Sequence, residues 1–148
     1  RNAKTLAQAC IQFRDKGQFR TTADLVGLCE TVVMGERWRY LSQVFQALRM
    51  EVNDEMGALR DFLADATEML AEGGRLVIMT YHSIEDRMVK NWLKTGNIEG
   101  EPKQDFYGNI ERPFKIITKK PIEASDSETK ENPRARSAKL RVGKKVSG

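Results

Sequence analysis

The chain has few of the residues that bind metal ions or form disulfide bonds. Its 148 residues include one histidine and two cysteines, with no Cys-x-x-Cys pair, so the sequence predicts no metal site. Cys10 and Cys29 fall on apolar faces of predicted helices, where free buried thiols of a reducing compartment are expected. No apolar run approaches the ~20 residues of a membrane-spanning helix. These shortages argue against a zinc-dependent, disulfide-stabilised or membrane-spanning protein.

Positive charge is concentrated near the end of the sequence. The net charge is +4. Residues 130–145 hold seven basic residues against one acid, so the remaining residues are slightly acidic. A localised basic segment favours a polyanionic partner such as a nucleic acid. A solvated strand and tail is the alternative that composition leaves open.

Residues 70–87 form the stretch around which the chain is organised. Gly73 and Gly74 predict the end of a helix. The apolar run at residues 76–79 (Leu-Val-Ile-Met) predicts a strand covered on both faces, as in a parallel sheet. Ser83 is expected to cap the next helix, with Asp86 as its capping-box acid. Because chemistry in α/β sheets collects at the carboxyl ends of strands, we single out the polar residues that follow this strand: Tyr81, His82, Ser83, Glu85, Asp86 and Arg87.

Helical periodicity covers most of the sequence before this stretch. Residues 2–16 and 23–34 predict a helical hairpin. A DNA-reading helix-turn-helix is disfavoured because residues 23–34 contain no basic side chain. Residues 38–70 are helical almost throughout, and a break is expected near Asn53-Asp54 or Gly57 because one helix would span roughly 48 Å.

The sequence after the central stretch predicts two further strands. A helix after Ser83 ends by Gly96, and residues 97–113 and 122–131 predict loops, the second acidic and flexible. Residues 114–120 and 137–145 predict strands that form an antiparallel pair at a sheet edge. Alternation in the last strand places Lys139 and Arg141 on one face. The fold class is therefore α/β, resembling the C-terminal half of a doubly wound domain.

Four sequence blocks occur in a distinctive order. They are residues 44–49 (Val-Phe-Gln-Ala-Leu-Arg) with 52–55 (Val-Asn-Asp-Glu), 73–76 (Gly-Gly-Arg-Leu), 82–87 (His-Ser-Ile-Glu-Asp-Arg) and 131–137 (Glu-Asn-Pro-Arg-Ala-Arg-Ser). Over residues 41–148 these blocks resemble the MraW/RsmH family in order and spacing. Members of that family use S-adenosylmethionine to methylate N4 of a cytidine in the decoding region of bacterial 16S rRNA.

The resemblance implies a fold and a division of the chain. Residues 41–148 would be the C-terminal half of a class I, Rossmann-like methyltransferase domain, and residues 1–40 the end of an inserted all-α domain. No Gly-x-Gly-x-x-Gly loop occurs here, so the donor-binding residues are expected in an N-terminal half outside this chain. The isolated 148 residues are then expected to be inactive.

The resemblance also assigns candidate site residues. His82, Ser83 and Glu85 would border the pocket of the acceptor cytidine. The candidate RNA-binding residues follow the basic pattern of the sequence: Arg87, Asn132, Arg134, Arg136, Lys139 and Arg141. Each has a plainer structural alternative, such as a helix cap, a surface ion pair or a turn contact.

The implied partners are 16S rRNA and the small ribosomal subunit, with no DNA and no membrane, in the cytoplasm. Two copies are expected to associate where a sheet edge is exposed. The competing hypothesis is a non-catalytic basic RNA-binding module that retains half of a methyltransferase fold.

Overall fold

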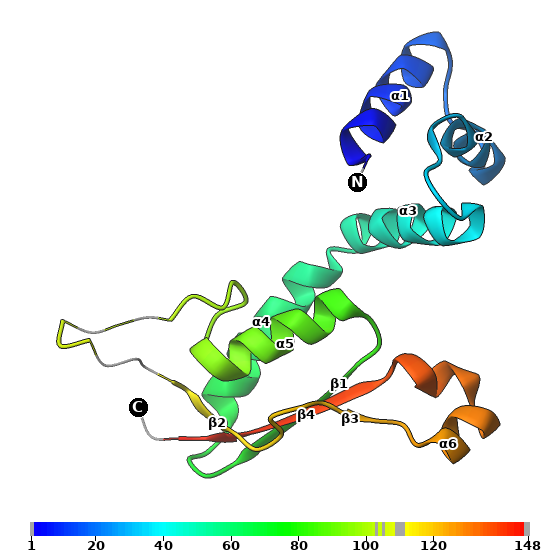
Figure 1. Ribbon diagram of the computed structural model, residues 1–148. Coiled ribbons are helices and arrows are strands. Elements are labelled where there is room, and N and C mark those ends of the chain that lie inside the picture. The colour runs from blue at the N-terminus through cyan, green and yellow to red at the C-terminus, as the bar shows by residue number, and fades with distance from the viewer. Residues whose placement is uncertain (1, 103, 105, 109–111, 147–148) are drawn as a thin grey trace. The chain divides into compact units, whose positions relative to one another are not determined.

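The computed structural model describes residues 2–102, 104, 106–108 and 112–146 (Figure 1). The chain forms two compact units, Arg1–Asp54 and Glu55–Gly148. The family resemblance predicts a division between residues 40 and 41, and in the structure Tyr40 and Leu41 lie in the buried core of the first unit together with Cys29. The helix that carries them therefore belongs with the helices before it.

The first unit is all-helical. It contains α1 (Ala3–Lys16), α2 (Thr22–Val32) and α3 (Arg37–Val52), so the predicted helical hairpin is confirmed. Thr21 caps α2 through a capping box with Asp24. The expected break near Asn53-Asp54 is also confirmed, because Asn53 caps the end of α3 and Asp54 adopts a φ of 46°. No helix in the described part of the chain is long and apolar enough to cross a membrane.

The second unit mixes helices and strands. It contains α4 (Glu55–Met69), β1 (Arg75–Thr80), α5 (Ser83–Thr95), β2 (Phe114–Ile116), β3 (Ile122–Glu123), α6 (Asp126–Glu131), the 3₁₀ helix η1 (Pro133–Ser137) and β4 (Lys139–Lys145). The prediction of a flexible loop over residues 122–131 was wrong, because β3 and α6 lie in this stretch. Ser125 accepts a hydrogen bond from the Glu128 amide and so caps α6 in this stretch.

β4 is the central strand of the sheet. β1 pairs along one side of it, and β2 and β3 pair along the other, all antiparallel. The antiparallel pairing of β2 with β4 is as predicted, but β4 does not lie at an edge. Its register sets Lys139 beside Thr80 and Lys144 beside Arg75. The start of β4 therefore lies at the carboxyl end of β1.

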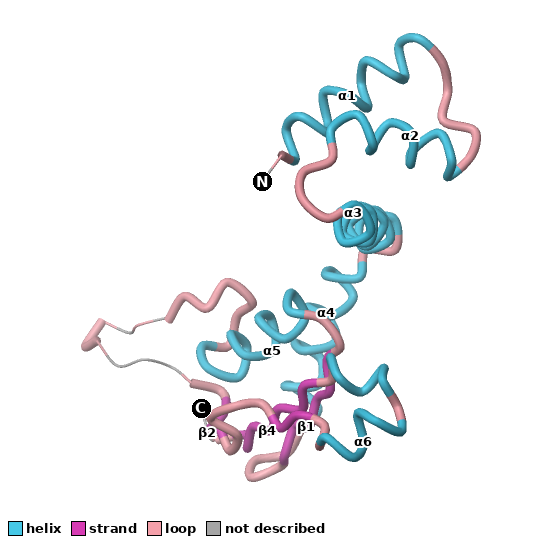
Figure 2. The backbone as a smooth tube through the Cα atoms, turned by 45° about the vertical axis from the view of Figure 1, so that its right-hand side comes forward, coloured by secondary structure: helices cyan, strands magenta, loops and turns pink. Residues whose placement is uncertain are grey.

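One face of the sheet is covered by helices. In the tube view, α4 and α5 lie above the strands (Figure 2). Leu76 and Ile78 of β1 are buried against this layer, whereas Val77 and Met79 are 56% and 51% exposed. The prediction of a parallel strand covered on both faces was therefore wrong for the described residues, among which β1 has only the antiparallel β4 beside it.

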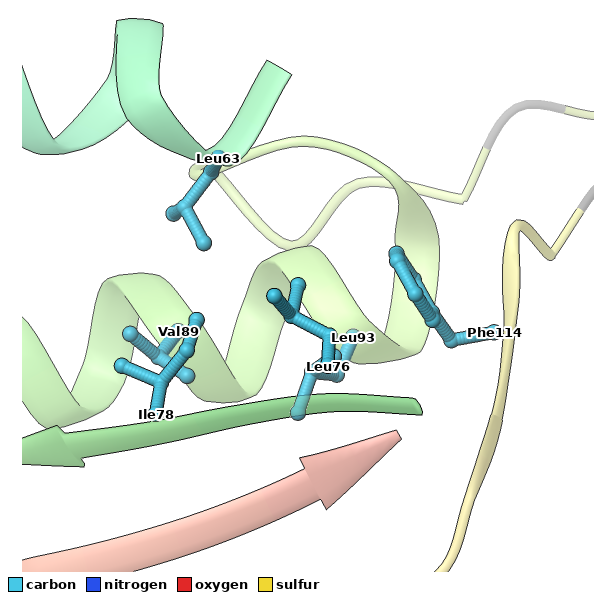
Figure 3. Close-up of a cluster of buried hydrophobic side chains, with 6 residues drawn as sticks. All are labelled: Leu63, Leu76, Ile78, Val89, Leu93 and Phe114. Carbon is cyan, nitrogen blue, oxygen red and sulfur yellow. The ribbon is translucent and has the colours of Figure 1, made fainter. Parts of the chain in front are cut away.

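The core of the second unit lies between the helices and the sheet. Figure 3 shows its six buried side chains, which come from α4, β1, α5 and β2: Leu63, Leu76, Ile78, Val89, Leu93 and Phe114. Lys145 ties β4 to the same helical layer, because its Nζ donates to the carbonyls of Thr67 and Leu70 at 2.6 and 2.8 Å. A cation is stabilising at this negative end of α4.

Gly143 leaves room for the core on the helix-covered side of β4. A Cβ at this position would lie 2.6 Å from Leu93 Cδ2 and 3.2 Å from Phe114 Cβ. We therefore expect Gly143→Ala to lower the free energy of unfolding by about 1–3 kcal/mol through overpacking. In a double-mutant cycle measured by urea denaturation, Leu93→Ala should cost less in the Gly143→Ala background than in the wild type. Additive losses would show that the backbone adapts without this clash.

Candidate functional site

The polar residues after β1 form a closed set of contacts at the start of α5. His82 caps the helix, and its Nδ1 accepts a hydrogen bond from the Glu85 amide at 3.3 Å. The Glu85 carboxylate in turn accepts from the amides of Tyr81 and His82, at 3.0 and 3.4 Å. The capping box is therefore His82 with Glu85. The predicted box of Ser83 with Asp86 was wrong by one residue, and Ser83 is the first residue of the helix.

Three ionisable side chains converge at this point. His82 Nε2 lies 3.0 Å from Glu85 Oε1, and both side chains are largely buried. Glu55, the first residue of α4, joins them, and the ligand atoms of the three side chains lie within 4.8 Å of one another. The sequence did not single out Glu55 as a site residue. The only sequence signal was its position directly after the Asn53-Asp54 helix break.

The capping hydrogen bond determines which ring nitrogen of neutral His82 carries the proton. Because Nδ1 accepts from the Glu85 amide, a neutral ring carries its proton on Nε2, facing the carboxylates. A metal ion at Nε2 would require the lone pair that this tautomer uses for N–H. All three side chains are of kinds that can bind a metal ion. With the capping bond in place, however, they present one N–H donor beside two carboxylates. This arrangement suits binding of a polar group that exchanges protons.

Asp86 forms a buried ion pair one turn into α5. Arg141 Nε and Nη2 donate to its two carboxylate oxygens at 2.6 and 3.0 Å, and both side chains are at least 88% buried. The hydrogen bonds from Arg141 lower the pKa of the Asp86 carboxyl, and the charges of Arg141, Lys139 and Lys90 add to this effect, while burial opposes it. The pair fastens the start of α5 to the central strand.

This pair corrects the expectation that Arg141 lies on an exposed basic face. Its guanidinium points to the helix-covered side of the sheet, where Arg141 is 7% exposed. Lys139 lies on the same side of β4, half-buried, with its Nζ 3.8 Å from Glu123. Arg141 is therefore a structural residue, because Asp86 binds its guanidinium, whereas the Lys139 side chain is still 38% exposed.

The other basic candidates lie on η1 and α5. Arg134 and Arg136 are exposed on η1, and the buried Ala135 between them anchors this helix. Asn132 caps η1 by accepting from the Arg134 amide at 3.2 Å. η1 is followed by the start of β4, where Lys139 pairs with Thr80 at the carboxyl end of β1. The two arginines therefore lie at the same end of the sheet as His82. Arg87 is exposed on α5, as is Ser83.

Comparison with known proteins assigns the chain. Residues 1–146 match the MraW methylase family. The chain is 50% identical over 146 residues to "Ribosomal RNA small subunit methyltransferase H" of Phocaeicola vulgatus and 48% identical to the protein of that name in Bacteroides thetaiotaomicron, covering 98% of this chain and 48% of each relative. It is 45% identical to the Cytophaga hutchinsonii protein of that name, of which it covers 49%. The chain thus spans about half the length of these curated relatives. It belongs to the MraW methylase family.

Proposed function

We propose that this chain is the C-terminal part of an S-adenosylmethionine-dependent enzyme that methylates N4 of a cytidine in small-subunit (16S) rRNA. The observation that carries the proposal is that ionisable side chains and exposed arginines lie at the same end of the sheet in a chain of the MraW family. The first group is His82, Glu85 and Glu55. The second is Arg134 and Arg136.

The chemistry of the proposed reaction uses both groups. A methyl group passes in line from the sulfonium of the donor to the amine, and the amine must then lose a proton. The carboxylate of Glu85 would accept a hydrogen bond from the exocyclic amine, with the Nε2–H of His82 beside it and Ser83 at the rim. Arg134, Arg136, Arg87, Asn132 and Lys139 would position the RNA by phosphate contacts.

The described residues at this edge do not by themselves suit the methyl donor. The first turn of α5 carries the carboxylates of Glu85 and Asp86 and is closed by its own capping box. A hollow lined by Lys94, Phe114 and Lys115 lies at the other end of the sheet. We therefore assign donor binding to the part of the relatives that this chain does not span. The isolated chain should bind RNA without transferring methyl groups.

The remaining features fit the same proposal. Residues 1–40 would be the end of a helical insertion and residues 41–148 would belong to the methyltransferase domain, with α3 (Arg37–Val52) crossing from one to the other. The outer edge of β1 has no neighbour among the described residues, so two isolated copies would pair there. The enzyme would act in the cytoplasm on rRNA or the small subunit, and not on DNA or at a membrane.

A chimera tests the proposal. The segment of the Phocaeicola vulgatus relative that precedes the matched region is joined to this chain, and methyl transfer to small-subunit rRNA is measured with labelled donor and mapped by mass spectrometry. We expect N4-methylcytidine to form. Glu85→Gln should reduce the rate about 10-fold or more, because the amide oxygen can still complete the capping box while the negative charge is lost.

The matched control is Glu72→Gln, which removes an exposed acid that lies before β1. It should leave the rate unchanged. A chimera that binds RNA but transfers no methyl group, beside an active parent enzyme, would contradict the proposal and support the non-catalytic RNA-binding module. A Glu85→Gln chimera with full activity would remove Glu85 from the acceptor site.

A further inference from the structure

The second unit has a hollow at the end of the sheet opposite His82. The hollow has a volume of about 340 Å³ and is lined by Lys94, Arg112, Phe114, Lys115, Ile116 and Val146. It lies at the last turn of α5 and the edge strand β2, next to the end of β4 that pairs with Arg75. His82 follows the opposite end of β1, whose six residues separate the two places by roughly 20 Å.

The lining combines an apolar floor with a positively charged rim. Phe114 is buried and packs into the core, whereas Ile116 is 38% exposed and Val146 is half-buried. The rim residues Lys94, Arg112 and Lys115 are all exposed, and none of them forms an ion pair with another described residue. Cations with no acid partner among the described residues, beside an apolar surface, suit a ligand with an anionic group and a flat apolar face.

The walls of the hollow are held in place by backbone contacts. The Val146 amide donates to the carbonyl of Pro113 at 3.1 Å. Gly96 ends α5 with a φ of 76°, and its position lies against the ring of Pro113. Pro113, which lies between Arg112 and Phe114, is thereby held by both α5 and the end of β4. A preformed hollow loses little conformational entropy when a ligand binds.

We infer that this hollow binds a nucleotide of single-stranded RNA at a distance from the methylated base. The base would rest on Ile116 and Val146 with the Arg112 guanidinium over it, and Lys94 and Lys115 would contact phosphates. The inference rests on the proposed function and names a second contact for the same substrate. Single-strand sites of 4–16 nucleotides are long enough to reach both ends of the sheet.

An extended acidic peptide is the competing ligand for a basic sheet edge. Peptides that add to a sheet gain affinity through main-chain hydrogen bonds along the edge strand. β2 has three residues, so it offers few such bonds. The hollow itself is in the size range of small-ligand pockets, which favours one nucleotide over a peptide strand.

Binding of a fluorescein-labelled 12-nucleotide single-stranded RNA to the 148-residue chain tests the inference, by anisotropy at several salt concentrations. The variant Lys94→Gln/Arg112→Gln/Lys115→Gln should weaken binding at least 5-fold and reduce the slope of log K against log salt by up to about 0.7 per lost phosphate contact. The control Lys119→Gln/Lys120→Gln/Lys130→Gln removes three exposed cations elsewhere. It should change affinity less than 2-fold.

Ile116→Asn separates a nucleotide site from a diffuse basic surface. It should weaken binding without changing the salt slope, because the floor releases no counterions. Equal effects of the two triple variants, or no effect of Ile116→Asn, would overturn the inference. Tighter binding of a glutamate 12-mer than of RNA would also overturn it, in favour of an acidic peptide. Arg134→Gln/Arg136→Gln tests the proposed RNA-binding face separately, so the proposed function can hold while this inference fails.

Discussion

Asp86→Asn should lower the free energy of unfolding of the second unit by about 3–5 kcal/mol, because it leaves the buried Arg141 guanidinium without a counterion. Arg141→Met should cost a similar amount by leaving the Asp86 carboxylate unpaired. The double variant Asp86→Leu/Arg141→Met should lose less than either single variant, since no uncompensated charge remains. Arg141 donates to both carboxylate oxygens, at 2.6 and 3.0 Å, and both side chains are largely buried.

Urea denaturation followed by tryptophan fluorescence measures this effect in the second unit alone. The sequence has two tryptophans; the exposed Trp38 is replaced by Phe, and Trp92, which donates to Thr67 at 2.9 Å, then reports on α5. Asp65→Asn removes an exposed acid from α4 and should change stability by less than about 0.5 kcal/mol. If Asp86→Asn also changed the free energy of unfolding by less than about 0.5 kcal/mol, the Asp86–Arg141 pair would have to be exposed to water, which would contradict the prediction.

The Asp86–Arg141 pair should make the free energy of unfolding depend on pH. The pKa of Asp86 is lowered in the folded chain, chiefly by its hydrogen bonds from Arg141, so the folded state holds this proton more weakly than the unfolded state. The stabilisation is therefore complete above the unfolded pKa of about 3.9 and is lost as the pH falls through the lowered folded value. Below about pH 5, the stability of Asp86→Leu/Arg141→Met should decline less steeply than that of the wild type.

Phe114→Ala should be the most costly single truncation of the core, at about 3–5 kcal/mol. The ring is 2% exposed and shares a buried cluster with Leu93 on the helix-covered side of the sheet (Figure 3). The residue belongs to a strand of three residues, so little else holds β2 to the helices once the ring is removed. The Trp92 fluorescence assay measures the loss.

Phe62→Ala is the matched control, because Phe62 is 53% exposed on α4. It should cost less than about 1 kcal/mol. A similar loss for both variants would contradict the assignment of Phe114 to the core. Phe114→Leu should recover part of the stability, since it keeps most of the buried apolar volume.

Sequence patterns predicted local structure better than they predicted pairing. The helical hairpin, the break at Asn53-Asp54, and the end of α5 at Gly96 follow from short-range rules of periodicity and capping. The apolar run in β1 did not indicate whether one or both faces are covered, because a strand beside an exposed face can also be continuously apolar. The capping error at Ser83 arose because His is an unusual cap, although Glu85 three residues later carried the signal.

Side-chain partners across the sheet were beyond the reach of sequence alone. Alternation placed Arg141 on the same face as Lys139, which is correct, but the pattern could not tell which face meets the helices. The pairing of Arg141 with Asp86, 55 positions away, depends on strand order. Glu55 lies beside His82 because α4 packs near the start of α5, and sequence patterns do not predict such a tertiary contact either.

The central position of β4 makes the sheet sensitive to incomplete synthesis. Among the described residues, β1, β2 and β3 each pair with β4 and with no other strand. A polypeptide that stops before Lys139 would contain three strand segments with no partner, and it would also lack the lysine that caps α4. Products of nonsense or frameshift mutations in the preceding codons should therefore be unfolded throughout the second unit, and cellular proteases should remove them before a partial sheet accumulates.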